Sequence, residues 1–229
     1  MSRLTKILIA TGVALVVVVV GGGFLAYKLF IESNPKPPAK ITKTTTVGGG
    51  TLDGTYRVAP GDANSFVGYR VQEQLVGGAI DQTTTGRTSD VTGSFTISGT
   101  TVRDVNVTAD LRTLTSDREQ RDNAIKDRGL ESNRFPEAKF VLTSPIDEPK
   151  LPAAGETVTT TAQGDFTLHG VTKHVEIPVE GRWDGRDVQV VGRLPIVFAD
   201  YGIQAPTSPV VASIDNKGEM EFQVFFRKA

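Results

Sequence analysis

An alternation of apolar and polar residues with a period of two is the feature of this sequence that most restricts its fold. It begins near Gly54 and continues to the C-terminus. In one run, Val67, Tyr69 and Val71 alternate with small or polar residues. Because successive side chains of a β-strand point to opposite faces, this alternation predicts strands that each have one apolar face.

About eight apolar stripes of this kind follow one another along the chain. They occupy residues 67–71, 91–97, 105–111, 140–142, 166–168, 175–179, 188–190 and 220–226. Glycine-containing turn signals separate several of them, at 98–99, 169–170, 184–185 and 216–218. This number of amphipathic antiparallel strands predicts an all-β barrel or sandwich. Pro178 indicates that its strand is an edge, bulged or bent, because proline cannot donate to a β-ladder.

One stretch departs from the strand pattern and predicts a helix. Ser116 and Glu119 have the spacing of a capping box, which marks a helix start. Asp117 and Arg121 are opposite charges four residues apart, a pair that stabilises an exposed helix by about 0.2–0.5 kcal/mol. Gly129 can adopt the left-handed conformation that ends a helix. We therefore expect one helix of about three turns that lies over the strands as a lid.

The charge balance and the absence of cysteine exclude several classes of function. The 25 Lys and Arg residues nearly balance the 26 Asp and Glu residues, and the formal net charge is −1. Nucleic-acid-binding domains usually carry a basic patch or a high pI, so we expect no nucleic-acid partner. Without cysteine, the chain has no disulfide, no thiolate metal site and no cysteine nucleophile.

The N-terminal residues predict a membrane anchor. Arg3 and Lys6 precede an apolar run at 7–26, which as a helix spans roughly 30 Å, the thickness of a bilayer core. No cleavage site of the Ala-x-Ala kind, as a cleaved signal peptide would have, occurs before Asn34. The positive charges ahead of the run place the first residues in the cytoplasm and the remainder outside.

Four regions are therefore predicted along the chain. Residues 1–6 form a cytoplasmic tail, 7–28 a single transmembrane helix, 29–53 a linker and 54–229 the β-domain. The linker is rich in Pro, Thr and Gly, a composition that predicts an extended tether without a core. We expect a single-pass protein of the cell membrane whose C-terminal domain lies outside the cytoplasm.

The apolar faces of the strands supply the candidate ligand-binding residues. Inside a small barrel, such side chains either fill the lumen as an ordinary core or line a pocket for an apolar molecule. No catalytic residue, metal ligand or cofactor is assigned; His169, His174 and Asp165 leave a metal site as a minor alternative. The candidates for ligand binding are Val67, Tyr69, Val71, Phe95, Val107, Phe140, Leu142, Phe166, Leu168, Ile177, Phe222 and Val224.

Five separated blocks of the sequence, in this order, resemble the YceI-like family. They are Ser-Phe-Val-Gly-Tyr-Arg-Val at 65–71, Val-Thr-Gly-Ser-Phe at 91–95, Arg-Asp at 121–122, Asn-Arg-Phe-Pro-Glu-Ala-Lys-Phe at 133–140 and Gly-Asp-Phe-Thr-Leu-His-Gly-Val-Thr-Lys at 164–173. The resemblance covers residues 54–229 and implies a lipocalin-like, extended antiparallel β-barrel. It also implies bacterial export, frequent dimerisation and an apolar lumen that binds polyisoprenoid chains such as those of quinones.

The chain departs from this family pattern in two respects. The family's early histidines, in His-Ser and Val-x-His, are replaced here in Asn64-Ser65 and Val71-Gln72-Glu73. A polar head-group contact from those histidines is therefore not implied. The β-domain is also tethered instead of free, which changes its location but not its fold.

Three hypotheses about function follow. The first is non-catalytic binding of a long isoprenoid lipid, of quinone or polyprenol type, by a membrane-tethered barrel for storage, transport or a stress response. The second is a ligand-free cell-surface interaction module, whose lumen is filled by Phe95, Phe140, Phe166 and Phe222. The third is a lipid-modifying enzyme, which requires ionisable groups that converge inside the barrel. The expected partners are the lipid, the membrane and a second copy in a homodimer.

Overall fold

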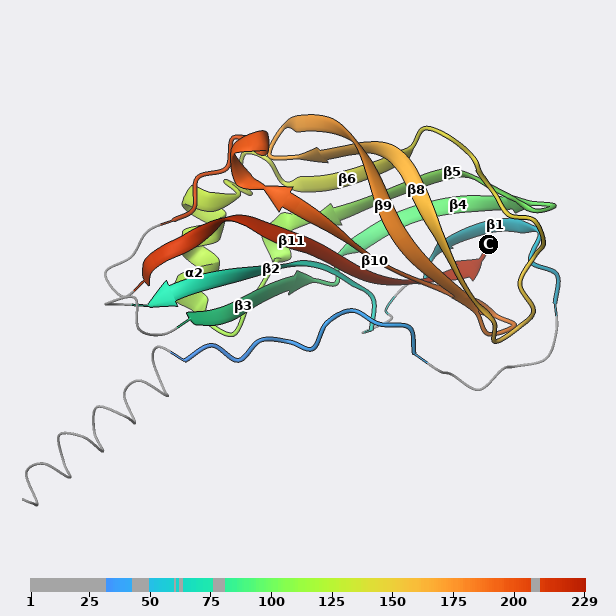
Figure 1. Ribbon diagram of the computed structural model, residues 1–229, viewed down its shortest axis with the longest axis horizontal. Coiled ribbons are helices and arrows are strands. Elements are labelled where there is room, and N and C mark those ends of the chain that lie inside the picture. Colours follow the sequence, from blue (N-terminus) through green and yellow to red (C-terminus); the bar gives the residue numbers. More distant parts are fainter. Residues whose placement is uncertain (1–31, 43–49, 60, 62–63, 76–80, 207–210) are drawn as a thin grey trace, which may run out of the picture. The chain divides into compact units, whose positions relative to one another are not determined.

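The structure is a computed structural model that describes residues 32–42, 50–59, 61, 64–75, 81–206 and 211–229 (Figure 1). The chain divides into two compact units, residues 1–34 and 35–229. The predicted anchor at 7–28 lies outside the described residues and stays a prediction. Within the described part of the chain, no helix is both long enough and apolar enough to cross a bilayer.

Eight strands of the described residues close an antiparallel barrel. The ring is complete because β1 pairs with β4 on one side and with β11 on the other. This closure confirms the prediction of an all-β barrel of about eight antiparallel strands. In ring order, the strands are β1 (Gly54–Val58), β4 (Val91–Ser98), β5 (Thr101–Asp110), β6 (Glu137–Leu142), β8 (Thr157–Leu168), β9 (Val171–Trp183), β10 (Asp187–Val197) and β11 (Val211–Lys228).

A two-stranded extension widens one end of the barrel. The strands β2 (Phe66–Leu75) and β3 (Asp81–Thr88) pair with each other, and β2 pairs with the first part of β11. A short strand, β7 (Ile146–Asp147), pairs with β5 at the other end. The edge of β3 is tied to the barrel through the backbones of Arg87 and Thr115, which exchange hydrogen bonds of 2.8 and 2.9 Å.

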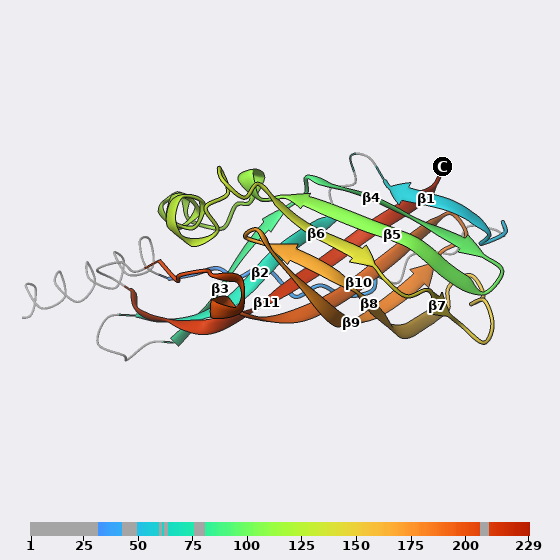
Figure 2. The ribbon, with the colours of Figure 1, turned by 90° about the horizontal axis from the view of Figure 1, so that it is seen from above.

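The predicted helix lies at the end of the barrel beside β2 and β3 (Figures 1 and 2). It consists of α2 (Glu119–Ala124), which continues as the π-helix η3 (Ile125–Gly129). Short 3-10 helices, η2 (Leu111–Thr113) and η4 (Phe198–Tyr201), follow β5 and β10. The prediction of one helix that ends at Gly129 is confirmed for the described residues. The left-handed ending is wrong, because the helix passes into Leu130 in the right-handed conformation.

The predicted capping box is also wrong. The N-cap residue of α2 is Arg118, and its side chain makes no capping hydrogen bond. The Ser116 hydroxyl instead accepts a hydrogen bond of 3.1 Å from the N–H of Arg118. The buried carboxylate of Asp122 reaches back and accepts the N–H of Ser116 at 2.8 Å. The helix start is therefore held by a carboxylate of its first turn, where the helix dipole favours negative charge.

One predicted turn, at 216–218, is wrong because β11 continues through it. Gly218 lies opposite Ile196 of β10, and the β10 ladder is regular on both sides of this pair. On the β2 side, the register shifts between Ile214 and Gly218. The extra residues are absorbed as a bulge in one ladder, so the glycine marks a bulge and not a hairpin.

The prediction for Pro178 is confirmed. The ladder between β9 and β10 ends at the pair of Val179 and Gly192. Pro178 is paired only on its other side, with Thr161 of β8. Because proline has no N–H to donate, the part of β9 from Val171 to Pro178 is not paired with β10 and forms an edge on that side.

Two apolar clusters form the core of the barrel. One contains Tyr56, Phe95 and Phe226, whose rings meet with centroid distances of 5.0 and 4.9 Å. The other lies toward the helix and contains Phe166 and Tyr201, with a centroid distance of 5.9 Å. Met220, Phe222 and Val190 are packed against both clusters. The barrel therefore has a packed region at each end, joined by half-buried apolar side chains.

Gly164 in β8 allows a close cross-strand contact. A Cβ at this position would lie 2.4 Å from the carbonyl oxygen of Val141 and 2.6 Å from the ring of Phe140. The ring therefore covers the glycine, and the sheet cannot accept a side chain there. Gly181 in β9 differs, because a Cβ there would meet no atom within 4 Å.

We predict that Gly164→Ala destabilises the domain by about 1–3 kcal/mol, because the neighbouring backbone and ring must move. For a chain of this size, that corresponds to a fall in Tm of about 2–4 °C for each kcal/mol. Gly181→Ala is the matched control and should leave Tm unchanged or slightly higher. Thermal unfolding followed by circular dichroism measures both, and equal Tm values for the two variants would contradict the prediction.

Candidate functional site

A cavity of about 220 Å³ lies inside the barrel, between the inward faces of the strands. Most of the 30 residues around it are apolar. The charged residues that border it are Glu148 and Arg182, and the hydroxyl-bearing ones are Thr100 and Thr160. A wall of this kind suits an apolar molecule and gives little compensation for the desolvation of a polar one.

The lining of the cavity extends along the strands. Its lining on β8 extends from Val158 to Phe166, which is roughly 26 Å of strand at about 3.3 Å per residue. On β11 it extends from Met220 to Phe226. The length of the lining matches a chain-like ligand better than a compact one.

The structure brings eight of the predicted site residues to this cavity. Each comes from the inward face of a strand, which the sequence alternation had assigned correctly. Whether they bind a ligand stays a prediction. The eight are Val67 (β2), Phe95 (β4), Val107 (β5), Phe140 (β6), Phe166 (β8), Ile177 (β9), Phe222 and Val224 (β11).

The other four predicted site residues do not border the cavity. Leu168 is buried in the core cluster near the helix, and Tyr69 and Leu142 pack against that cluster. Val71 lies further along β2, opposite Thr84 of β3. Alternation fixes which face of a strand a side chain is on, but not its level along the barrel axis.

Several cavity residues were missed by the sequence analysis. Leu52, Leu151 and Pro152 come from connections that have no periodic pattern. Val158 and Ala162 belong to the first half of β8, where threonines occupy most positions. The β-propensity of threonine was the available signal for that half-strand.

A cluster of ionisable side chains lies where α2 meets β2 and β3. The guanidinium of Arg121 donates to the buried carboxylate of Glu73 at 3.3 Å and to Asp117 at 2.5 Å. Glu73 also accepts a hydrogen bond of 3.3 Å from the Thr84 hydroxyl. The ion pair predicted between Asp117 and Arg121 is therefore confirmed, and Arg121 in addition ties the helix to β2.

The hydroxyl of Tyr69 points into this cluster without a hydrogen-bond partner among the described residues. Burial raises the pKa of Tyr69, with the nearby carboxylates acting in the same direction and Arg121 opposing them. The ring lies across Gly86, where a Cβ would approach it to 2.4 Å. Two residues earlier on the same face of β2, Val67 lines the cavity.

The two histidines do not form a metal site. His174 Nδ1 lies 3.1 Å from Asp165, whereas the nitrogens of His169 each lie 2.9 Å from an oxygen, of Tyr201 and of Glu131. Within the described residues, no group of three His, Cys, Asp or Glu side chains is arranged to hold a metal ion.

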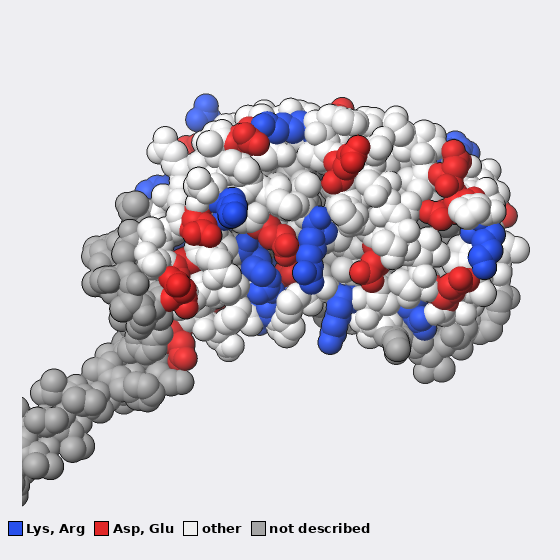
Figure 3. All heavy atoms as spheres, in the orientation of Figure 1, with Lys and Arg blue, Asp and Glu red and all other residues white. Residues whose placement is uncertain are grey.

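The charged groups of the barrel exterior are mixed in sign. On the face drawn in Figure 3, Lys and Arg alternate with Asp and Glu, and neither sign covers a large continuous area. A surface of this kind carries no extended basic footprint for a phosphate backbone on that face.

Sequence comparison identifies relatives of the barrel. Residues 56–226 match the family model described as the YceI-like domain. The chain is 32% identical over 139 residues to a UPF0312 protein of Shewanella sp. (strain MR-4), which covers 57% of this chain and 69% of that protein. It is 30% identical over 140 residues to a UPF0312 protein of Pseudomonas fluorescens, an alignment that covers 57% of this chain and 70% of that protein.

Structural comparison identifies solved proteins of the same fold. A polyisoprenoid binding domain from Saccharophagus degradans, implicated in plant cell wall breakdown, matches with a TM-score of 0.59 and 19% identity, covering 76% of this chain and 98% of that domain. BcnA of Burkholderia cenocepacia matches with a TM-score of 0.53 and 18% identity, covering 71% of this chain and 96% of BcnA. At sequence identities this low, the structural similarity establishes the fold alone.

We predict that Tyr69→Phe makes unfolding less sensitive to alkaline pH. The folded-state pKa of Tyr69 lies above the ordinary value of 10.0, so above about pH 10 the unfolded chain loses this proton first and stability falls as the pH rises. Phe cannot ionise, so the variant should lose less stability in that range. Urea unfolding at pH 7 and at pH 10–11 measures the difference.

A second tyrosine provides a comparison at neutral pH. The hydroxyl of Tyr56 donates to the carbonyl oxygen of Leu52 at 3.0 Å. Tyr56→Phe should therefore cost about 1 kcal/mol at pH 7, whereas Tyr69→Phe should cost nothing or stabilise the domain, because it removes an unsatisfied buried group. An equal loss at pH 7 in both variants would show that Tyr69 has a partner.

Proposed function

The chain belongs to the YceI-like family, and from this premise we propose that its barrel binds a long isoprenoid lipid, of quinone or polyprenol type, without changing it chemically. The observation that carries the proposal is the apolar cavity, whose lining extends along the strands. A polyisoprenoid binding domain from Saccharophagus degradans has the same fold as this chain. Burial of an apolar chain in such a cavity is favourable by about 25 cal/mol for each Å² removed from water.

The arrangement of the four large phenylalanines supports binding over a ligand-free module. A module with a filled lumen would have Phe95, Phe140, Phe166 and Phe222 packed together at its centre. These side chains instead stand around the cavity as part of its wall. Their flat, apolar rings suit contact with the methyl and methylene groups of an isoprenoid chain.

The cluster around Tyr69 lies beyond the cavity lining, past Val67 on the same face of β2, and supports a neutral head group for a lipid that extends to it. Three carboxylates (Glu73, Asp117 and Asp122) and one guanidinium (Arg121) act on the Tyr69 hydroxyl. The excess of negative charge opposes a phosphate and favours a hydroxyl or carbonyl group. The unpartnered hydroxyl of Tyr69 can donate to, or accept from, such a group.

The same cluster gives less support to a lipid-modifying enzyme. Its ionisable side chains are engaged with one another, since Arg121 bonds both Glu73 and Asp117, and Asp122 bonds a backbone N–H. A general acid or base must be free to exchange a proton with its substrate. Binding without chemistry therefore accounts better for these contacts.

The membrane location is part of the proposal. The apolar run at 7–26 follows two positive charges, which supports a single-pass anchor with the barrel outside the cytoplasm. A tethered barrel would collect or release its lipid close to the bilayer in which such lipids dissolve. A homodimer, expected from the family resemblance, stays a prediction.

We predict that Ala162→Phe reduces the amount of bound lipid severalfold. Ala162 is buried on the cavity face of β8, so a phenyl ring there occupies space that the lipid needs. Thr161→Phe is the matched control, because Thr161 is exposed on the other face of the same strand. The full chain is purified from a membrane-containing host in detergent, and bound lipid is extracted and quantified by mass spectrometry.

The results separate the hypotheses. A stoichiometric isoprenoid in the wild type and the Thr161→Phe variant, but little in Ala162→Phe, supports the cavity as the lipid site. If the folded wild type carries no isoprenoid even when quinones and polyprenols are supplied, the binding proposal fails. Recovery of a chemically altered lipid would favour the enzyme.

A further inference from the structure

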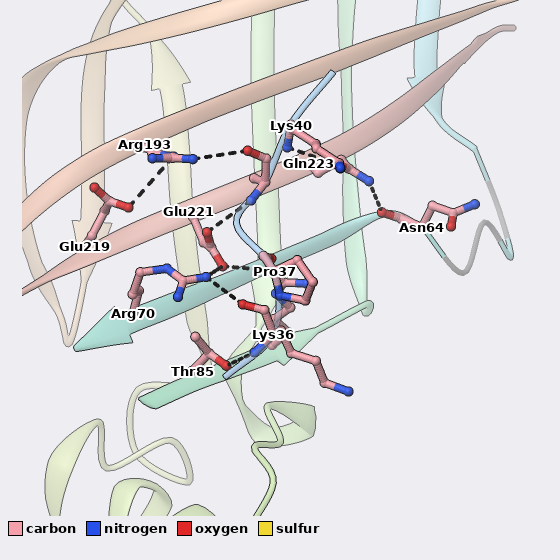
Figure 4. A network of polar contacts seen from close by, with 12 residues as sticks. Lys36, Pro37, Lys40, Asn64, Arg70, Thr85, Arg193, Glu219, Glu221 and Gln223 are labelled. Atoms are coloured by element: carbon pink, nitrogen blue, oxygen red, sulfur yellow. Dashed lines mark hydrogen bonds and ion pairs between the residues drawn. The ribbon is translucent and has the colours of Figure 1, made fainter. Parts of the chain in front are cut away.

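Residues 36–42, called the strap below, lie in an extended conformation on the outer surface of the barrel (Figures 1 and 4). They cross β2, β3, β10 and β11 and belong to the same compact unit as the barrel. The sequence analysis had placed them in the predicted linker and gave no sign that they are docked. The contacts of the strap show how it is held.

Side chains of the barrel accept hydrogen bonds from the main-chain N–H groups of the strap. Four donors are satisfied in this way, from one end of the strap to the other. They are Lys36 to Thr85 Oγ1 at 2.9 Å, Ala39 to Glu221 Oε2 at 3.2 Å, Lys40 to Gln223 Oε1 at 3.3 Å and Thr42 to Gln189 Oε1 at 2.8 Å.

The main-chain carbonyl groups of the strap are bound as well, mostly by guanidinium groups. Charge-assisted hydrogen bonds of this kind are among the stronger ones in proteins. The donors are Arg70 to Lys36 at 2.8 Å, Arg87 to Pro37, Arg193 to Ala39 at 3.3 Å and Gln189 to Lys40 at 2.9 Å. The barrel therefore contacts both the donors and the acceptors of the strap's main chain.

The side chains of the strap contribute little except at one position. Ala39 is 3% exposed and packs with Phe66 and Val191 of the barrel, whereas the side chains of Lys36 and Lys40 are exposed. Pro37 and Pro38 have no N–H and occupy positions between the four bonded donors. Proline also favours the extended conformation that the surface binds.

A buried carboxylate lies at the centre of this surface. Glu221 is fully buried and accepts a hydrogen bond of 3.4 Å from Arg70 (Figure 4). It also accepts from Arg87 at 2.8 Å and from the N–H of Ala39. The same two arginines donate to strap carbonyls. The ion pairs thus hold the arginine groups in position for the strap, and the strap covers the carboxylate.

We propose that this face, called the groove below, is a peptide-binding surface that recognises an extended main chain, and that its occupant is the strap of the same chain, docked in cis. Docking would change the length of the tether. If the predicted anchor ends at residue 28, six residues lie between it and Pro35, a span of at most roughly 20 Å. With the strap released, the linker to residue 53 reaches about 80 Å.

The positions of the two ends of the intervening chain support docking in cis. Thr42 is bonded to Gln189 near the start of β10. Gly50, where the described chain resumes, lies beside Gly185 in the turn that precedes β10. Seven residues therefore separate two points on the same part of the barrel, a gap that one chain spans easily. The groove and tether length are independent of the lipid proposed for the cavity.

Hydrogen exchange of the full chain in detergent tests the docking. The amides of Ala39, Lys40 and Thr42 should exchange about tenfold or more slowly than in an unstructured peptide, because each is hydrogen-bonded to the barrel. Ala39→Gln should abolish this protection, since its side chain does not fit the buried site. Lys40→Gln introduces the same residue at the adjacent exposed position and should retain the protection.

A peptide added in trans tests the groove itself. A fluorescent peptide of residues 34–43 should bind the Ala39→Gln chain, whose groove is vacated, and bind the wild type at least tenfold more weakly. Thr85→Val removes the acceptor for Lys36 with little change in shape, and serves if Ala39→Gln does not fold. This second variant should show faster exchange at the strap and an unchanged barrel.

Three results would overturn the proposal. Free exchange of the strap amides in the wild type would show that the strap is not docked. Equal peptide binding by the wild type and the Ala39→Gln chain would show that the groove is not occupied in cis. Protection that appears only in a dimer, and is lost on dilution, would assign the strap to the groove of a second copy. None of these results depends on whether the cavity holds a lipid.

Discussion

The closure of the barrel through β1 is the constraint on which the rest of the structure depends. Tyr56 and its neighbours pair with β4 on one side and with the end of β11 on the other. Where the ring is closed, its eight strands have no free edge, and the side chains on one face of each strand are held inside the barrel. The apolar cavity, the two core clusters and the outward polar surface are all consequences of that division.

The strand β11 connects the two sites of the molecule because its alternate residues face opposite ways. Met220, Phe222 and Val224 point inward and line the cavity. Glu221 and Gln223 point outward and bind the strap. A single strand thus carries an apolar surface suited to a lipid and a polar surface suited to a peptide main chain, separated by the thickness of one sheet.

Local sequence signals succeeded where backbone geometry alone decides the outcome. Alternation assigned the inward residues correctly, and Pro178 marked the place where the ladder to β10 ends. The signals failed where a partner outside the local motif takes the hydrogen bond or continues the ladder. Ser116 had the spacing of a capping box, but Asp122 takes its N–H instead. The glycine at 218 had the context of a turn, but pairing with β10 extends β11 through it.

The sequence by itself determined an all-β domain, the inward face of each recognised strand and the single helix, while the choice of a barrel over a sandwich came from the resemblance to the YceI-like family. The first three follow from side-chain periodicity and from the properties of proline and glycine, which act within a few residues. Only the tertiary structure decided that Phe140 borders the cavity while Leu142 packs beyond it, and that residues 36–42 dock on the barrel. Both outcomes depend on strand register and on contacts between residues far apart in the chain, for which a local pattern carries no information.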